Sequence, residues 1–229
     1  MKTYFFTILV TLFSTTYVWA QNLETELSPA DLKAITAHEF VLKTRELPGS
    51  VWPEITYYAI VGVSPLEAAG VFAAYDAQKD YVPNVIKSTP VKHLTATEVL
   101  TDYELHMPFP ISNAHYIHGA KLFKHKNDYE VQWYMLESSS AEDVKGSVYF
   151  QFYEGKTLMR YRSYVKPKSV LGSLVKSRML KDVLLSITAI RNFMEKSKRE
   201  NPVFVSKYSE FIIRALNGEF VYQTIIDKK

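Results

Sequence analysis

The segment from Val85 to Val165 most constrains the fold, because it alternates apolar and polar residues in about six runs separated by turn-prone stretches. Turns at this spacing are typical of an antiparallel meander. A single long amphipathic segment follows, from Pro167 to about Arg199, with apolar residues spaced three and four apart. One sheet and one long helix must bury their apolar faces against each other. The order therefore predicts an α+β fold, with a curved antiparallel sheet wrapped around a long C-terminal helix.

The residues before this segment carry two helix-start signals. Ser28-Pro29-Ala30-Asp31 places a capping serine, a proline and an acidic residue in helix-start order, and predicts a helix to about Arg45. Glu54 to Val61 is rich in β-branched and aromatic residues and predicts a strand. Ser64-Pro65-Leu66-Glu67 repeats the start signal and predicts a short helix to about Tyr75.

Both ends of the chain have features that suggest a domain organisation. Residues 1–20 combine a lone lysine, a short apolar run and the small-residue ending Val18-Trp19-Ala20, which predicts a secretion signal. The tail from Val203 to Leu216 predicts a further helix. We therefore expect a signal peptide at 1–20, an N-terminal helical extension at 21–50, one domain at 51–200 and a C-terminal extension at 201–229. The N-terminal helix could pack on the outer face of the sheet.

Composition narrows the compartment and the chemistry. The chain has no cysteine, which excludes a thiol nucleophile and a cysteine zinc site and, for an exported protein, favours a bacterial periplasm or medium. Its 27 basic and 24 acidic side chains are too nearly balanced to indicate nucleic-acid binding. We expect an exported, soluble monomer.

Three stretches carry a resemblance to a known superfamily. They are Ser64 to Asp76 followed by Tyr81-Val82-Pro83-Asn84-Val85, then Met107-Pro108-Phe109-Pro110-Ile111-Ser112, and the long helix entered through Pro167 and Gly172. In this order they resemble the helix-grip superfamily, also called START-like or SRPBCC, which includes START lipid-transfer domains, pollen-allergen-like proteins and polyketide cyclases. One departure is that Ala114-His115 stands where START domains commonly have Arg-Asp.

The resemblance implies a cavity between the sheet and the long helix, and a lipid or other hydrophobic molecule as its ligand. Residues that alternate along the predicted strands would form the wall, and apolar positions of the helix would form a lid. No cofactor and no metal is expected. The predicted ligand-binding residues are Tyr103, Leu105, Met107, Trp133, Met135, Phe150 and Tyr161 on the sheet, and Leu174, Arg178, Val183 and Ile187 on the helix.

Several polar residues are further candidates for a site. His115 and His118 point to opposite faces of a strand, which removes the obvious metal pair. Asp102, Glu104 and His106 share a face that we interpret as solvated surface. Arg160 and Arg162 could bind a lipid phosphate at a cavity mouth, although paired surface charges are the ordinary explanation. A basic cluster could make transient contact with a membrane surface, although lysines on a helix commonly serve solubility. This cluster consists of Lys166, Lys168, Lys176, Arg178 and Lys181.

Two alternatives to a binding protein stay open. The first is a cyclase- or hydrolase-like enzyme on the same scaffold, although the sequence has no phosphate loop and no Gly-x-Ser-x-Gly motif. The second is a structural or protein-binding module, which would have a filled interior and a large exposed apolar patch.

Overall fold

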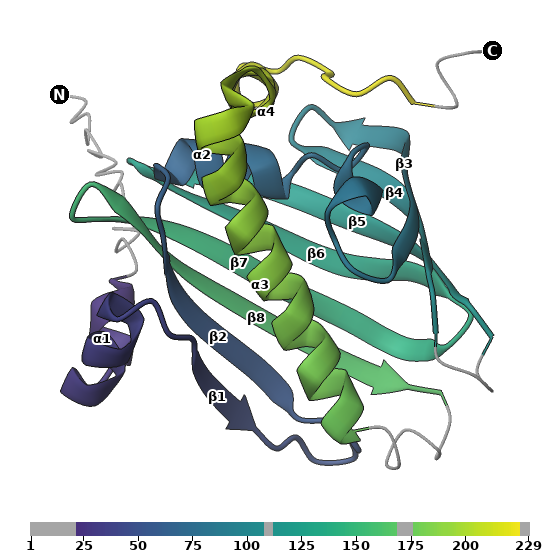
Figure 1. Ribbon diagram of the computed structural model, residues 1–229. Coiled ribbons are helices and arrows are strands. Elements are labelled where there is room, and N and C mark those ends of the chain that lie inside the picture. The colour runs from purple at the N-terminus through teal and green to yellow at the C-terminus, as the bar shows by residue number, and fades with distance from the viewer. Residues whose placement is uncertain (1–21, 108–111, 169–175, 225–229) are drawn as a thin grey trace, which may run out of the picture.

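An eight-stranded antiparallel sheet with strand order β1-β2-β8-β7-β6-β5-β4-β3 forms the body of the molecule. The computed structural model describes residues 22–107, 112–168 and 176–224. In Figure 1 the helix α3 runs diagonally across one face of this sheet, and α4 lies at one end of it. The strands are β1 Val41–Arg45, β2 Glu54–Val61, β3 Val85–Thr95, β4 Glu98–Leu105, β5 Ala114–His125, β6 Asp128–Ser138, β7 Ala141–Tyr153 and β8 Lys156–Pro167.

The predicted meander is confirmed. Strands β3 to β8 are consecutive antiparallel neighbours, and β2 pairs with β8 from Ile55–Ser163 to Val61–Thr157. Strand β2 has the bounds that its composition predicted. The predicted secretion signal lies outside the described residues. Among the described helices, none combines the length and apolarity that a membrane crossing requires.

The N-terminal helix is shorter than predicted. Helix α1, Pro29–Thr36, has the expected capping box between Ser28 and Asp31, but it ends well before Arg45. His38 then adopts a left-handed conformation with φ of 63°, and the following residues form β1. Strand β1 pairs with β2, because an unpaired edge of the sheet offers hydrogen bonds that outweigh a modest helix preference.

The N-terminal segment covers the outer face of the sheet. Leu23, Leu27 and Ile35 are buried there with residues of β1, β2, β7 and β8. Leu23 lies in the short 3-10 helix η1, Leu23–Glu26, whose position is fixed by a 2.6 Å hydrogen bond from its backbone nitrogen to Gln151 Oε1. The possibility that α1 packs on the outer face agrees with this arrangement.

Three helices cover the inner face. Helix α2, Pro65–Phe72, starts at the predicted capping box of Ser64 and Glu67. Helix α3, Lys176–Glu200, is followed after Asn201 by α4, Pro202–Leu216. Helices α2 and α4 approach closely, because a Cβ on Gly70 would lie 2.7 Å from the backbone nitrogen of Ser209. The short 3-10 helix η2, Gln78–Asp80, lies between α2 and β3.

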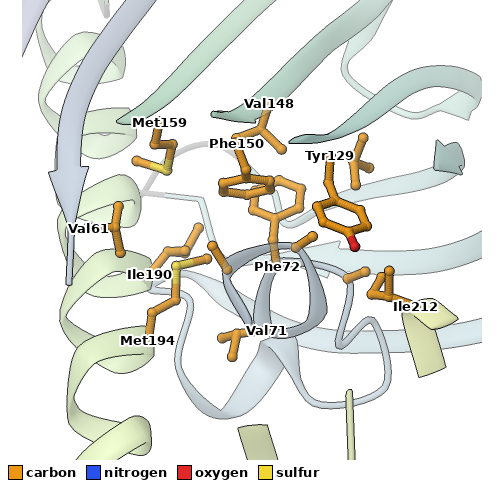
Figure 2. Close-up of a cluster of buried hydrophobic side chains, with 14 of the residues drawn as sticks. Val61, Val71, Phe72, Tyr129, Val148, Phe150, Met159, Ile190, Met194 and Ile212 are labelled. Atoms are coloured by element: carbon orange, nitrogen blue, oxygen red, sulfur yellow. The ribbon is translucent and has the colours of Figure 1, made fainter. Parts of the chain in front are cut away.

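The main core lies where α2 packs on the sheet. Figure 2 shows Phe72 of α2 directed at Phe150 and Val148, with Met194 of α3 next to Ile190 in the same cluster. The rings of Phe72 and Phe150 are 5.9 Å apart in an edge-on arrangement. Phe150, Val148 and Met194 are all fully buried. We call this region the filled half of the inner face.

Candidate functional site

A pocket of about 370 Å³ lies beyond the filled half, between the sheet and the N-terminal part of α3. Its wall comes from β4, β5, β6 and β8, and one side comes from α3. Further lining residues come from α2, η2, the loop before β3 and the start of β3, and from the segments before β2 and after β4. We call this region the open half. Its described lining residues are Trp52, Phe72, Tyr75, Gln78, Val82, Pro83, Asn84, Val85, Thr101, Tyr103, Leu105, His106, Met107, Tyr116, His118, Ala120, Val131, Trp133, Tyr161, Val165, Arg178, Met179, Asp182, Val183, Ser186, Ile187 and Ile190.

Most of the residues predicted for a cavity are brought together here. Strand alternation and the helical apolar stripe placed these residues on shared faces of the strands and the helix, and those faces border the pocket. Those that line the pocket are Tyr103, Leu105, Met107, Trp133, Tyr161, Arg178, Val183 and Ile187.

Two of the predicted residues are placed elsewhere. Phe150 lies on the inner face but is sealed beneath Phe72, so it belongs to the filled half and does not line the pocket. Met135 does not line the pocket but packs against a small cluster that includes Ala114 and Val144 and that adjoins the pocket wall. Leu174 lies outside the described residues. Strand alternation gives a face and not the position of the helix that covers it, so it did not separate Phe150 from the residues that line the pocket.

A glycine shapes the floor of the pocket. Gly146 of β7 pairs with Trp133 of β6, and a Cβ at this position would lie 2.3 Å from the indole. The missing side chain lets the indole lie over β7, where its ring centroid is 5.1 Å from that of Tyr161. An aromatic surface therefore forms part of the wall.

Some polar lining groups are tied to protein partners. Tyr103 donates a 2.7 Å hydrogen bond to Gln78 Oε1, and Gln78 Nε2 donates to the carbonyl oxygen of Phe72. Burial raises the pKa of Tyr103 well above its ordinary value, so the phenol stays neutral. These contacts fix the end of α2 against β4.

His118 and Thr101 differ from these groups. They are direct cross-strand partners on β5 and β4, and both line the pocket. Among the described residues, neither His118 Nε2 nor Thr101 Oγ1 has a hydrogen-bond partner, although both atoms are buried. The rings of Tyr103 and Tyr116 lie 5.5 Å and 5.2 Å from the imidazole. Burial lowers the pKa of His118 to about 4, so the ring is neutral at pH 7.

The sequence contained a signal for His118. The spacing from His115 correctly placed the two histidines on opposite faces but did not decide which face was the inner one. His118 alternates with Ala120 and Leu122, both of which are buried. That apolar alternation could have identified His118 as the inward residue.

The charged residues considered as sites have other partners. Asp102 pairs with Lys87 at 2.5 Å, and Glu104 accepts a 2.9 Å hydrogen bond from Asn113 Nδ2, as expected for surface residues. His106 departs from this group, because it follows the end of β4 and lines the pocket.

Arg160 does not lie at the pocket. It lies on the outer face, buried to 3% exposure, and its Nη1 is 2.5 Å from Glu26 Oε1. Arg162 shares that face by strand alternation. The hypothesis that these arginines bind a phosphate at the mouth of the cavity was therefore wrong, because the opposite face of β8 supplies the wall.

The opening of the pocket is marked by the lining residues that are exposed to solvent. These are Pro83, Asn84, His106 and Arg178, which place the opening between the loop before β3, the end of β4 and the start of α3. Arg178 pairs with Asp182 at 3.7 Å. In the basic cluster, Lys166 pairs with Glu142 at 2.6 Å. Within the described part of the chain, no group of three or more His, Asp or Glu side chains is arranged to hold a metal ion.

The arrangement of sheet, α3 and pocket can be compared with known proteins. No protein-family model matches the sequence, and no curated protein matches it significantly. A STAR-related lipid transfer protein fragment from Xanthomonas axonopodis superposes with a TM-score of 0.61 at 14% identity, over 68% of this chain and 93% of that one. This chain has the START-like helix-grip fold.

Other solved structures share this fold. Human StAR-related lipid transfer protein 5 has a TM-score of 0.60 at 11% identity, over 70% of this chain and 84% of its own. An aromatase/cyclase from Streptomyces has a TM-score of 0.54 at 10% identity, over 64% of this chain and 96% of its own. The helix-grip fold therefore occurs in lipid-transfer proteins and in a cyclase, so the fold alone does not separate binding from catalysis.

Proposed function

We propose that this protein is exported and binds a hydrophobic small molecule non-covalently in the pocket of the open half. The observation that carries the proposal is the pocket itself, about 370 Å³ between α3 and the sheet and lined mainly by aromatic and aliphatic side chains. Its volume is within the range of about 300 to 1,000 Å³ that small-molecule sites occupy.

Burial of hydrocarbon is a sufficient source of affinity for this function. Each methylene moved from water into an apolar site contributes about 0.8 kcal/mol, before the entropy cost of association. Trp133, Tyr161 and Val183 offer such an environment. The lipid-transfer proteins that share the fold are consistent with a ligand of this kind.

An enzymatic function is the second candidate, and the buried histidine in the pocket is the observation that favours it. A general base needs a substrate proton within reach and commonly a second group that orients or complements it. Among the described lining residues, Asp182 is the only carboxylate, and it pairs with Arg178 near the opening. This arrangement supports binding better than catalysis. The structural-module hypothesis requires a filled interior, which a pocket of this size argues against.

Native mass spectrometry of the protein purified from its own host tests the proposal. We expect a bound mass that is released by solvent and recovered as an apolar compound. Val183→Phe should block the pocket and lose this mass, whereas Leu185→Phe, on an exposed position of the same helix, should retain it. A wild-type protein that carries no bound compound and binds no lipid of a test panel would contradict the proposed binding function. Chemical conversion of an added compound would favour the enzymatic function.

Export has its own test. The mature protein in a periplasmic or culture-medium fraction should begin at Gln21, as read from its intact mass. Full-length protein that stays in the cytosol would contradict export without affecting the proposal about the pocket.

A further inference from the structure

Two residues of the described pocket lining have buried polar atoms without a hydrogen-bond partner, and these two residues are direct cross-strand neighbours. Thr101 and His118 are directly paired across β4 and β5, with Tyr103 and Tyr116 as the next inward pair towards the end of β4. In the other direction the next inward pair is Val99 and Ala120, which belong to the main core. Thr101 and His118 therefore lie towards the inner end of the pocket, where Ala120 both lines the pocket and joins the core of the filled half.

Buried polar atoms without partners are costly, and such atoms are rarely left unsatisfied in a folded protein. Thr101 is 1% exposed, yet its Oγ1 and His118 Nε2 lack hydrogen-bond partners among the described residues. A hydroxyl can donate or accept a hydrogen bond, and neutral imidazole has one donor and one acceptor nitrogen. A ligand that carries one hydroxyl could satisfy both atoms at once.

We propose that Thr101 and His118 form a subsite for a neutral hydroxyl group at the buried end of the ligand, whose apolar body extends towards Met107 and the opening. The inference rests on the proposed function, and it names the ligand as a hydrophobic alcohol or phenol and not a fatty-acid anion.

The charges around the pocket support a neutral group. Arg178 is the only permanently charged basic residue among the described lining residues, and it lies at the opening, where it pairs with Asp182. The lowered pKa of His118 means that the imidazole carries no positive charge at pH 7 to compensate an anion. A carboxylate at the inner end would be buried without a counter-charge, which is strongly unfavourable.

Matched aromatic probes test this subsite. The fluorescent compound N-phenyl-1-naphthylamine reports on pocket occupancy, and 2-naphthol, naphthalene and 2-naphthoate compete with it at pH 7.5. One satisfied hydrogen bond corresponds to a preference of about three- to tenfold, so 2-naphthol should bind more tightly than naphthalene by that factor. We expect 2-naphthoate to be the weakest competitor.

Variants assign the preference to the two residues. His118→Phe and, separately, Thr101→Val should bring the ratio of 2-naphthol to naphthalene affinity close to one while the reporter still binds. His115→Phe, on the same strand but on the outer face, should keep the wild-type ratio. Thr101→Val preserves side-chain shape and provides a second measurement if His118→Phe fails to fold.

The outcomes separate the two proposals. If the reporter binds but 2-naphthol competes no better than naphthalene, or if both variants keep the wild-type ratio, the hydroxyl subsite is overturned and the hydrophobic pocket stands. If the wild-type protein binds neither the reporter nor any of the three competitors, the proposed function is overturned as well.

Discussion

The two halves of the inner face use the same kinds of side chain but pack differently. In the filled half, Phe72 of α2 meets Phe150 and Val148 in a cluster that also includes Met194 of α3. In the open half, Trp133 and Tyr161 face the N-terminal part of α3 across a pocket of about 370 Å³, and Trp133 meets Phe72 at the border with the filled half, where the ring centroids are 6.0 Å apart.

The difference comes from the number of helices above the sheet. Helix α2 packs directly on the strands in the filled half and is itself backed by α4, with Gly70 allowing the close approach. No described helix takes this position above the strand ends that line the pocket. An aromatic residue thus belongs to the core where two layers of helix cover it, and it lines the pocket where a single helix covers it. Residue type alone therefore does not distinguish the two roles.

The largest expected difference between the two halves is the loss of stability when a side chain is shortened to alanine. Phe150→Ala should lower the free energy of unfolding by about 3 to 5 kcal/mol, because it leaves a cavity in a close-packed region. Leu105→Ala in the open half should cost less than about 2 kcal/mol, because part of this side chain already faces the pocket. Urea denaturation followed by circular dichroism measures both values. Equal costs for the two variants would mean that the halves do not differ in packing.

Replacing a small side chain by a larger one should also destabilise the filled half more than the open half. Val148→Phe should destabilise the protein by about 1 to 3 kcal/mol through overpacking, because Val148 is fully buried in the filled half. Val183→Phe can extend into the pocket and should change stability by less than about 0.5 kcal/mol. Thermal unfolding of both proteins without ligand provides the measurement. A strongly destabilised Val183→Phe would show that the open half has no spare volume.

Acid should weaken the open half through His118. Its folded-state pKa is about 4, whereas a histidine in an unfolded chain has a pKa of about 6.5, so the unfolded chain binds the proton more readily between these values. Stability should therefore be unaffected by this group above pH 6.5 and fall as the pH drops from 6.5 towards 4, by at most about 1.4 kcal/mol per pH unit.

The control for this pH effect is His118→Phe. In this variant the free energy of unfolding should lose the part of its pH dependence that comes from His118 and keep the part that comes from other groups. Urea denaturation at several pH values in that window gives the two slopes. Identical slopes in wild type and variant would show that the imidazole is not held neutral by burial.

Much of the architecture could be predicted from local pattern. The capping boxes at Ser28 and Ser64 fixed where two helices begin, because a side-chain oxygen followed by an acidic residue satisfies free backbone amides. Strand alternation likewise selected the inward face of β4 and β8, including Tyr103 and Tyr161. Local pattern failed for Val41–Arg45, which becomes β1 only because the edge of β2 is available for pairing.

The features of the candidate site also divide into those that the sequence could predict and those that it could not. The sequence by itself determined the order of the elements and the faces that their apolar residues share, since both follow from short-range periodicity and capping. Only the tertiary structure decided that Phe150 is sealed while Trp133 stays accessible, and that His118 faces inward beside Thr101. Those outcomes depend on where α2, α3 and α4 lie above the sheet, which is set by contacts between residues far apart in the chain.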